Sequence, residues 1–159
     1  MKKFIPMLLL AIFALGVASC KKKNETPVPP APQPMALEGT TWDAKSVAGI
    51  ESNANIQMKA DFIKGGVMRL TVVRQPKATA AAVNTTVFEA KYTFNKPVLT
   101  LTGMKMTTQA GDPLLSDAAK KNIIEIFSKG GKLVDQRPLS LVFNEKANNP
   151  ITLVKVEKK

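Results

Sequence analysis

Histidine is absent from this chain, and cysteine, tryptophan and tyrosine occur once each among its 159 residues. Without histidine the chain has no imidazole base, no Ser-His-Asp or Cys-His nucleophilic site, and no ordinary zinc or haem ligand set. Because most enzyme classes are thereby excluded, we expect a protein that is not an enzyme and that uses no metal ion and no cofactor. The length is that of one domain, and the composition is close to the globular average.

A long apolar run is also lacking. After a pair of lysines, the apolar run Phe4–Gly16 is followed by the small residues Ala18 and Ser19, which is the pattern of a secretory signal peptide. A run of about 15 residues is shorter than the roughly 20 that a membrane-spanning helix requires. Three lysines, Lys21–Lys23, then end the run. We therefore predict a signal peptide over residues 1–19 rather than a transmembrane helix.

The single cysteine closes this pattern. The quartet Val17-Ala18-Ser19-Cys20 resembles the bacterial lipobox, in which cleavage before the cysteine follows attachment of diacylglycerol to its thiol. The resemblance implies cleavage between Ser19 and Cys20 and lipidation of Cys20, so that the lipid bilayer is the first expected partner. At about 0.8 kcal/mol per buried methylene, two or three acyl chains anchor a protein permanently. Because Lys21 rather than Asp follows the cysteine, the resemblance also implies the outer membrane, on either of its faces.

Residues 20–36 are predicted to be the lipidated cysteine and a proline-rich tether. Five prolines lie between Asn24 and Pro34, and this segment has no apolar periodicity, which is typical of a polyproline II spacer. At about 3.1 Å per residue, such a spacer holds the following domain up to about 50 Å from the bilayer.

The domain over residues 37–159 is basic. It contains 18 basic residues against 11 acidic ones, a net charge of +7. Only three of the basic residues are arginines, and no aromatic residues are interleaved with the lysines as base stacking would require. We therefore expect the lysines to be solvated and do not expect nucleic acid as a partner.

Most of the domain alternates between apolar and polar residues, as strands do. Residues 56–62 and 68–73 alternate on either side of Lys64-Gly65-Gly66, which predicts a β-hairpin. About seven or eight antiparallel strands in this length favour a small lipocalin-like barrel or a strongly curved sheet, because closure removes exposed strand edges. One further strand is predicted directly after Trp42, and the others cover residues 88–94, 98–106, 139–143 and 151–156.

One segment has a different period. Over residues 113–129, apolar side chains, Ala118 among them, recur at helical spacing opposite polar ones of both charge signs. This pattern predicts an amphipathic helix that packs on the sheet. Asp112 or Ser116 can cap its start, and Gly130-Gly131 can end it.

The opening of the domain and one strand pair resemble a known family. The segment Leu37-Glu38-Gly39-Thr40-Thr41-Trp42, and a tyrosine-bearing strand that turns into a Leu-Thr-Leu-Thr strand over residues 92–102, resemble the lipocalin-like domains of small bacterial lipoproteins. The resemblance implies a barrel whose floor is sealed by Trp42. The spacing of Gly39, Trp42 and Gly49 is also similar to META-domain lipoproteins, which are the second assignment; their Gly-Cys-Asn signature is absent.

A closed barrel of this kind has candidate ligand contacts in its interior. Thioethers and aromatic rings would line an apolar pocket, with the tyrosine as a polar handle. The alternative is a filled core, because eight strands enclose a space that side chains just fill. The candidate lining residues are Trp42, Met58, Met68, Phe88, Tyr92 and Phe143.

Two functions therefore remain open. In the first, the barrel binds a small apolar or amphipathic ligand. In the second, the barrel is solid and its outer surface docks on another protein of the cell envelope. The carboxylates, Glu51 among them, are scattered without the close pair that glycoside chemistry requires, so we expect them to be solvated surface charges.

Overall fold

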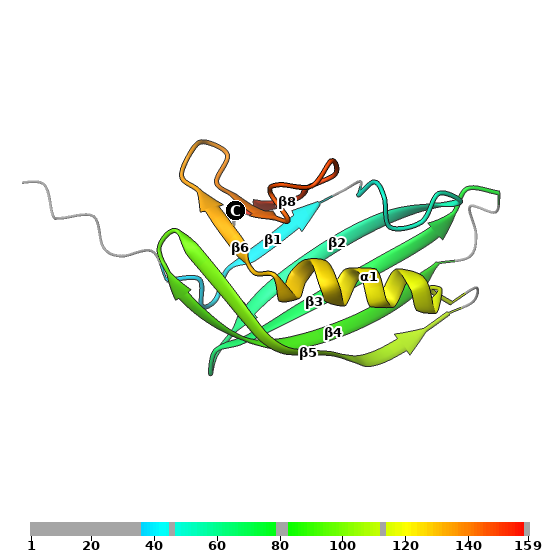
Figure 1. The fold of residues 1–159 in the computed structure, drawn as a ribbon. Helices are drawn as coiled ribbons and strands as arrows, with labels where there is room; N and C mark the ends of the chain where they lie inside the picture. The colour runs from blue at the N-terminus through cyan, green and yellow to red at the C-terminus, as the bar shows by residue number, and fades with distance from the viewer. Residues whose placement is uncertain (1–35, 45–46, 79–82, 112–113, 158–159) are drawn as a thin grey trace, which may run out of the picture. The chain divides into compact units, whose positions relative to one another are not determined.

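Eight antiparallel strands close into a barrel within residues 36–44, 47–78, 83–111 and 114–157, the part of the chain that the computed structural model describes (Figure 1). The predicted signal peptide, Cys20 and the tether up to residue 35 lie outside these residues. The mainly β fold with one helix is confirmed. The elements are β1 (Thr41–Ala44), β2 (Ala54–Ile63), β3 (Val67–Pro76), β4 (Asn84–Asn95), β5 (Val98–Ala110), α1 (Asp117–Ser128), β6 (Gly131–Val134), β7 (Ser140–Phe143) and β8 (Ile151–Lys155).

The strands pair in chain order, and β8 returns to pair with β1. Of the two predicted alternatives, the structure therefore has the closed barrel and not the open curved sheet. The long strands β2 to β5 pair with one another over most of their length. In contrast, β5 and β6 pair only through Val98↔Lys132 and Leu99↔Gly131. The short strands thus complete the ring of strands but cover only part of the length of β2 to β5. The helix α1 lies over these long strands in Figure 1.

The hairpin of β2 and β3 forms as the alternation predicts. Every second residue of β2 from Ala54 to Phe62 is buried, and so is every second residue of β3 from Met68 to Arg74. Between the strands, Gly65 and Gly66 have φ of +83° and +71°, in the left-handed region that glycine adopts without a steric penalty. Local turn chemistry and the burial pattern therefore specify the same register.

The helix is shorter than the segment 113–129 over which apolar residues recur at helical spacing. It begins after Ser116, whose hydroxyl accepts a hydrogen bond from the Ala119 N–H at 3.2 Å, and Leu115 is already buried before it. Ser116 is thus the N-cap, as one of the two predictions had it, because its side chain satisfies an amide that the first turn leaves unpaired. Ala118, which the sequence placed with the apolar residues, is exposed. The buried side chains of α1 are Ala119, Ile123, Ile126 and Phe127.

Strand β6 was not predicted. Its first residue, Gly131, was assigned to the end of the helix, and four residues are too few for an alternating pattern to stand out. Only Leu133 of this strand is buried. In the structure, the positive φ of Gly130, +78°, separates α1 from β6, and β6 bridges β5 and β7. The barrel could not close without it.

Buried apolar side chains form one cluster that includes both the strands and the helix. The Phe127 ring of α1 and the Phe143 ring of β7 have centroids 4.4 Å apart. A Cβ on Gly131 would come within 2.8 Å of the Phe143 ring, so the strand backbone itself is packed against that side chain. The helix thus contributes side chains to the same core that the strands enclose.

Candidate functional site

The predicted pocket residues lie in the interior of the barrel. Trp42, Met68, Phe88 and Phe143 have no exposed surface, and Met58 is 1% exposed. Trp42 Nε1 donates a hydrogen bond to Thr40 Oγ1 at 2.8 Å, so the polar end of the indole is satisfied within the protein. These five side chains belong to the single apolar cluster. The structure therefore brings them together as packed neighbours.

Tyr92 differs from the other five. It is half-buried, and its ring meets Phe62 edge to face at a centroid distance of 4.9 Å. Burial raises the pKa of the Tyr92 hydroxyl above its ordinary value of 10.0, and the Glu38 carboxylate adds to this shift. Tyr92 thus lies at the rim of the core, at the end of the barrel where the chain enters through residues 37–40. We call this the entry end.

A shallow pocket opens at the entry end beside Phe62. Its volume is about 790 Å³, and its walls are mainly apolar. None of the six predicted residues lines this pocket, nor any of three others that the described residues form on the surface. The lining of the entry-end pocket is Ala36, Glu38, Gly39, Phe62, Ile63 and Lys64.

The opposite end of the barrel, where β3 ends and β4 begins, is polar inside. We call it the far end. Arg74 Nε lies 2.5 Å from Glu51 Oε2, and the two side chains are only 7% and 8% exposed. The other carboxylate oxygen of Glu51 accepts a hydrogen bond at 3.0 Å from the backbone N–H of Ser116, the N-cap of α1. The prediction that Glu51 is a solvated surface charge was wrong, because a buried arginine and the helix start neutralise it.

These contacts explain the acidity of Glu51. Burial alone would raise the pKa of its carboxyl group. The hydrogen bonds from Ser116 and the guanidinium of Arg74 outweigh burial and leave the pKa below its ordinary value of 4.5. Glu51 is therefore ionised at neutral pH, and its charge links β3 to the first turn of the helix.

Further polar side chains continue this cluster along β4. Asn84 and Thr86 are completely buried. The Asn84 amide donates to the carbonyls of Ala110 and Gly111 at 2.7 and 3.0 Å and accepts from Thr86 Oγ1 at 3.0 Å. Opposite Thr86, Gln109 Nε2 is buried without a hydrogen-bond partner among the described residues. The far end thus contains a cluster of buried, hydrogen-bonded polar side chains, whereas Phe62 and Tyr92 at the entry end meet through their rings.

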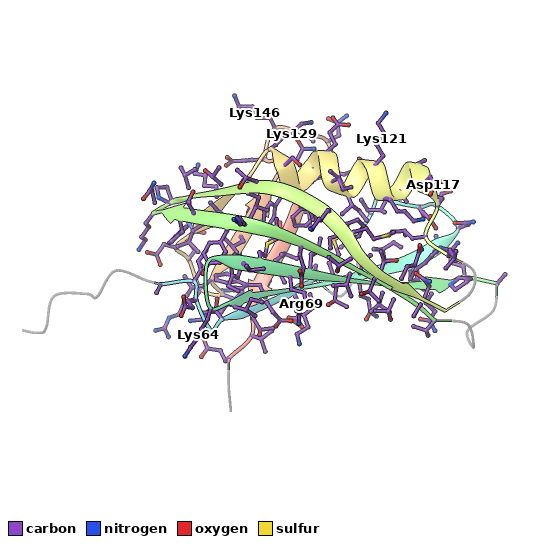
Figure 2. The ribbon with its side chains drawn as sticks, turned by 90° about the horizontal axis from the view of Figure 1, so that it is seen from below. Lys64, Arg69, Asp117, Lys121, Lys129 and Lys146 are labelled. Carbon is purple, nitrogen blue, oxygen red and sulfur yellow. The ribbon has the colours of Figure 1, made fainter. Side chains whose placement is uncertain are left out.

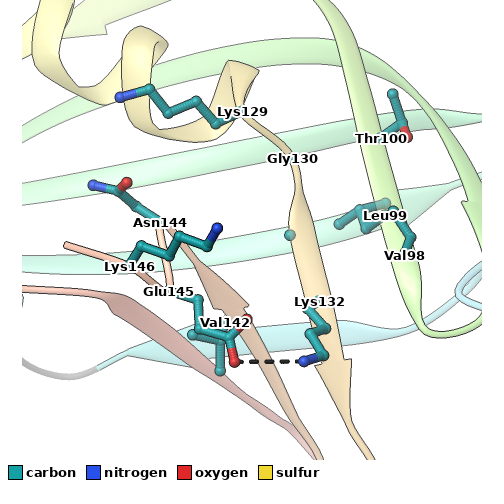
Figure 3. Close-up of a pocket in the computed structure, with 11 residues that line it drawn as sticks. Val98, Leu99, Thr100, Lys129, Gly130, Lys132, Val142, Asn144, Glu145 and Lys146 are labelled. Atoms are coloured by element: carbon teal, nitrogen blue, oxygen red, sulfur yellow. Dashed lines mark hydrogen bonds and ion pairs between the residues drawn. The ribbon is translucent and has the colours of Figure 1, made fainter.

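A second kind of site lies on the outer surface, where α1 ends (Figure 3). A pocket of about 350 Å³ is bounded by β5, by the Gly130-Gly131 connection into β6, and by the segment that follows β7. We call it the basic pocket, because three lysines and one glutamate line it. Its lining residues are Val98, Leu99, Thr100, Lys129, Gly130, Gly131, Lys132, Val142, Asn144, Glu145 and Lys146.

Close backbone contacts fix the shape of the basic pocket. A Cβ on Gly130 would approach the Leu99 carbonyl oxygen to 2.5 Å, so only glycine allows β5 and the helix end to come this close. On the other side, Asn144 has a φ of +56°, a left-handed conformation that asparagine tolerates better than most residues. Sequence reasoning missed this site, because its lysines are far apart in the chain and Gly130-Gly131 also fits a helix end.

Among the described residues, no group of three or more acidic, cysteine or histidine side chains is placed to hold a metal ion. The described part of the chain also contains no helix of the length and apolar character that a membrane span requires. Fold and surface thus define a closed antiparallel barrel, a helix that packs one face against the barrel core, and a basic pocket outside. No model of a known protein family matches the chain, and no curated protein matches it significantly.

Proposed function

We propose that this chain is a lipid-anchored, non-catalytic protein of the bacterial cell envelope whose barrel is a solid scaffold that acts through its outer surface. The observation that carries the proposal is the burial of Trp42, Met58, Met68, Phe88 and Phe143 in one apolar cluster with the helix. A side chain that is packed against protein on all sides offers no surface to a ligand. The second of the two functions left open by the sequence is therefore the better supported one.

The anchor rests on the N-terminal sequence. The lipobox-like quartet before Cys20 and the proline-rich tether after it are what an acylated protein held away from a membrane requires. The lysine at position 21 favours the outer membrane. Lipocalin-like lipoproteins remain the preferred family, with META-domain lipoproteins second.

Replacement of the lipidated residue tests the anchor. The Cys20→Ala variant should lose membrane retention and fatty-acid labelling in its host, whereas Ser19→Ala, which keeps a small residue before the cleavage site, should retain both. Unchanged fractionation of Cys20→Ala would overturn the anchor.

The entry-end pocket favours a second candidate function, the binding of a small apolar ligand. Its mainly apolar walls lie beside Phe62, which contacts Tyr92. Trp42 is the only tryptophan and is completely buried, so its fluorescence reports on the barrel interior. A saturable change of Trp42 emission on titration with the apolar probe N-phenyl-1-naphthylamine would favour this candidate, and an unchanged emission supports the solid scaffold.

A further inference from the structure

The charges around the basic pocket are unevenly balanced. Lys129 Nζ lies 3.0 Å from Glu125, one helical turn earlier, and Lys132 Nζ lies 3.5 Å from Glu145. Lys146 forms no ion pair within the described ranges of the chain. The lining side chains therefore carry three positive charges against one negative charge.

Figure 3 shows how the charged ends are arranged. Lys146 extends from the segment after β7 with its ammonium group directed toward the β6 backbone, and Lys132 meets Glu145 at the lower edge of the pocket. Lys129 leaves the helix end above them. The ammonium group of Lys129 points away from the other two, back along the helix toward Glu125. Lys146 and Lys132, which come from two separate segments of the chain, are therefore the cations that an anion beside β6 would meet.

The wall behind the lysines is apolar. Val98, which is 52% exposed, and the half-buried side chain of Val142 form it. An exposed valine next to lysines offers a surface for a hydrocarbon chain, and the lysine stems can extend that surface. A neutral ligand would leave the ammonium groups unused, and inorganic phosphate would leave the wall unused.

We propose that the basic pocket binds a small amphipathic anion, a carboxylate or phosphate group carried on a short apolar chain. The anionic group lies between Lys132 and Lys146, and the chain lies on Val98 and Val142. Such a group occurs on short fatty acids, on alkyl phosphates and at the ends of apolar peptides. This inference rests on the proposed function, because it assigns binding to the outer surface of a solid barrel.

Glycine amides beside and away from the pocket make the test specific. The full acylated chain, labelled with ¹⁵N-glycine and embedded in phosphatidylcholine nanodiscs, is titrated with hexanoate, hexyl phosphate and 1-hexanol. The amide signals of Gly130 and Gly131 should shift saturably with at least one anion and not with hexanol, and those of Gly65 and Gly66 should not move. Equal shifts with hexanol, or no shift with either anion, would overturn the proposal.

Charge reversal locates the binding. Lys146→Glu should weaken the binding of the anion about tenfold or more, the loss of a charge-assisted hydrogen bond with added repulsion. Lys121→Glu is the matched control: Figure 2 shows Lys121 on α1, and it does not line the pocket. An equal loss in both variants would indicate only the net positive charge of the surface and would overturn the site.

Two failures can be told apart in this experiment. If the anions and hexanol change Trp42 emission while Gly130 and Gly131 stay unmoved, the ligand enters the barrel, and the solid scaffold is wrong. If neither Trp42 nor the two glycines respond, the basic pocket is wrong while the solid scaffold stands.

Discussion

The two ends of the barrel are stabilised by different forces. At the entry end, aromatic and aliphatic side chains meet, as the edge-to-face contact of Phe62 with Tyr92 illustrates. At the far end, Arg74 and Asn84 are buried, and the side chain of Glu51, which is 8% exposed, pairs with Arg74. Apolar packing tolerates approximate fits, whereas a buried charge requires its partner in place. We therefore expect the two ends to respond differently to mutation, pH and salt.

The largest effect should come from removal of a core ring. In Phe143→Ala, the loss of the contact with Phe127 and the cavity left behind should lower the free energy of unfolding by about 3–5 kcal/mol. Denaturant titration measures this loss, and pH between 6 and 8 should not alter it. Val142→Ala, at the half-buried neighbouring position, is the control and should cost much less. Equal losses would contradict the assignment of Phe143 to the core.

Breaking the charged pair at the far end should lower the free energy of unfolding nearly as much. Glu51→Ala leaves the guanidinium of Arg74 buried without its carboxylate, which should cost about 3 kcal/mol. The double variant Glu51→Leu/Arg74→Leu removes both charges and should be clearly more stable than Glu51→Ala. A double-mutant cycle by denaturant titration checks this, and additive losses would contradict the coupling between the two residues.

A pH titration sharpens the comparison. Because the pKa of Glu51 is lower in the folded protein than in the unfolded chain, its stabilising contribution is present above about pH 4.5 and is lost as the pH falls through the folded-state pKa. The free energy of unfolding should therefore decline in acid, and Glu51→Gln should flatten part of the decline. An unchanged acid profile in Glu51→Gln would contradict this role.

The smallest effect belongs to the entry end. Burial raises the pKa of Tyr92, so the folded protein holds the phenolic proton after the unfolded chain has lost it. Stability should consequently fall as the pH rises above about 10, and Tyr92→Phe should remove this part of the loss. Thermal unfolding at pH 9 to 11 measures it; an identical loss in Tyr92→Phe would contradict the assignment.

The sequence predicted the apolar half of this structure well, for a physical reason. Alternation of Met68, Leu70 and Val72 follows from which face of a strand is buried, and a turn such as Lys64–Gly66 is encoded locally. Burial of Glu51 depends on contacts with Arg74 and Ser116, which are 23 and 65 positions away. A charged residue that is buried through such distant partners looks like a surface residue in the sequence.

Prediction of the sites was limited in the same way, because they too depend on contacts between residues that are distant in the sequence. Five of the six predicted pocket residues are buried in the barrel and Tyr92 is half-buried at its rim, but packing determines whether an interior residue can meet a ligand. The basic pocket combines Val98, Lys129 and Lys146, which come together only because β6 joins β5 to β7. Prediction of that pocket required the strand that the periodicity did not reveal.

Native mass spectrometry of the full chain, extracted gently from the membranes of its own host, tests the central claim most directly. The account predicts a chain processed to begin at Cys20 and carrying acyl chains, from which unfolding in the gas phase releases no interior ligand. A small molecule bound in stoichiometric amount to wild type and to Lys146→Glu alike, and lost only on unfolding, would contradict the solid barrel.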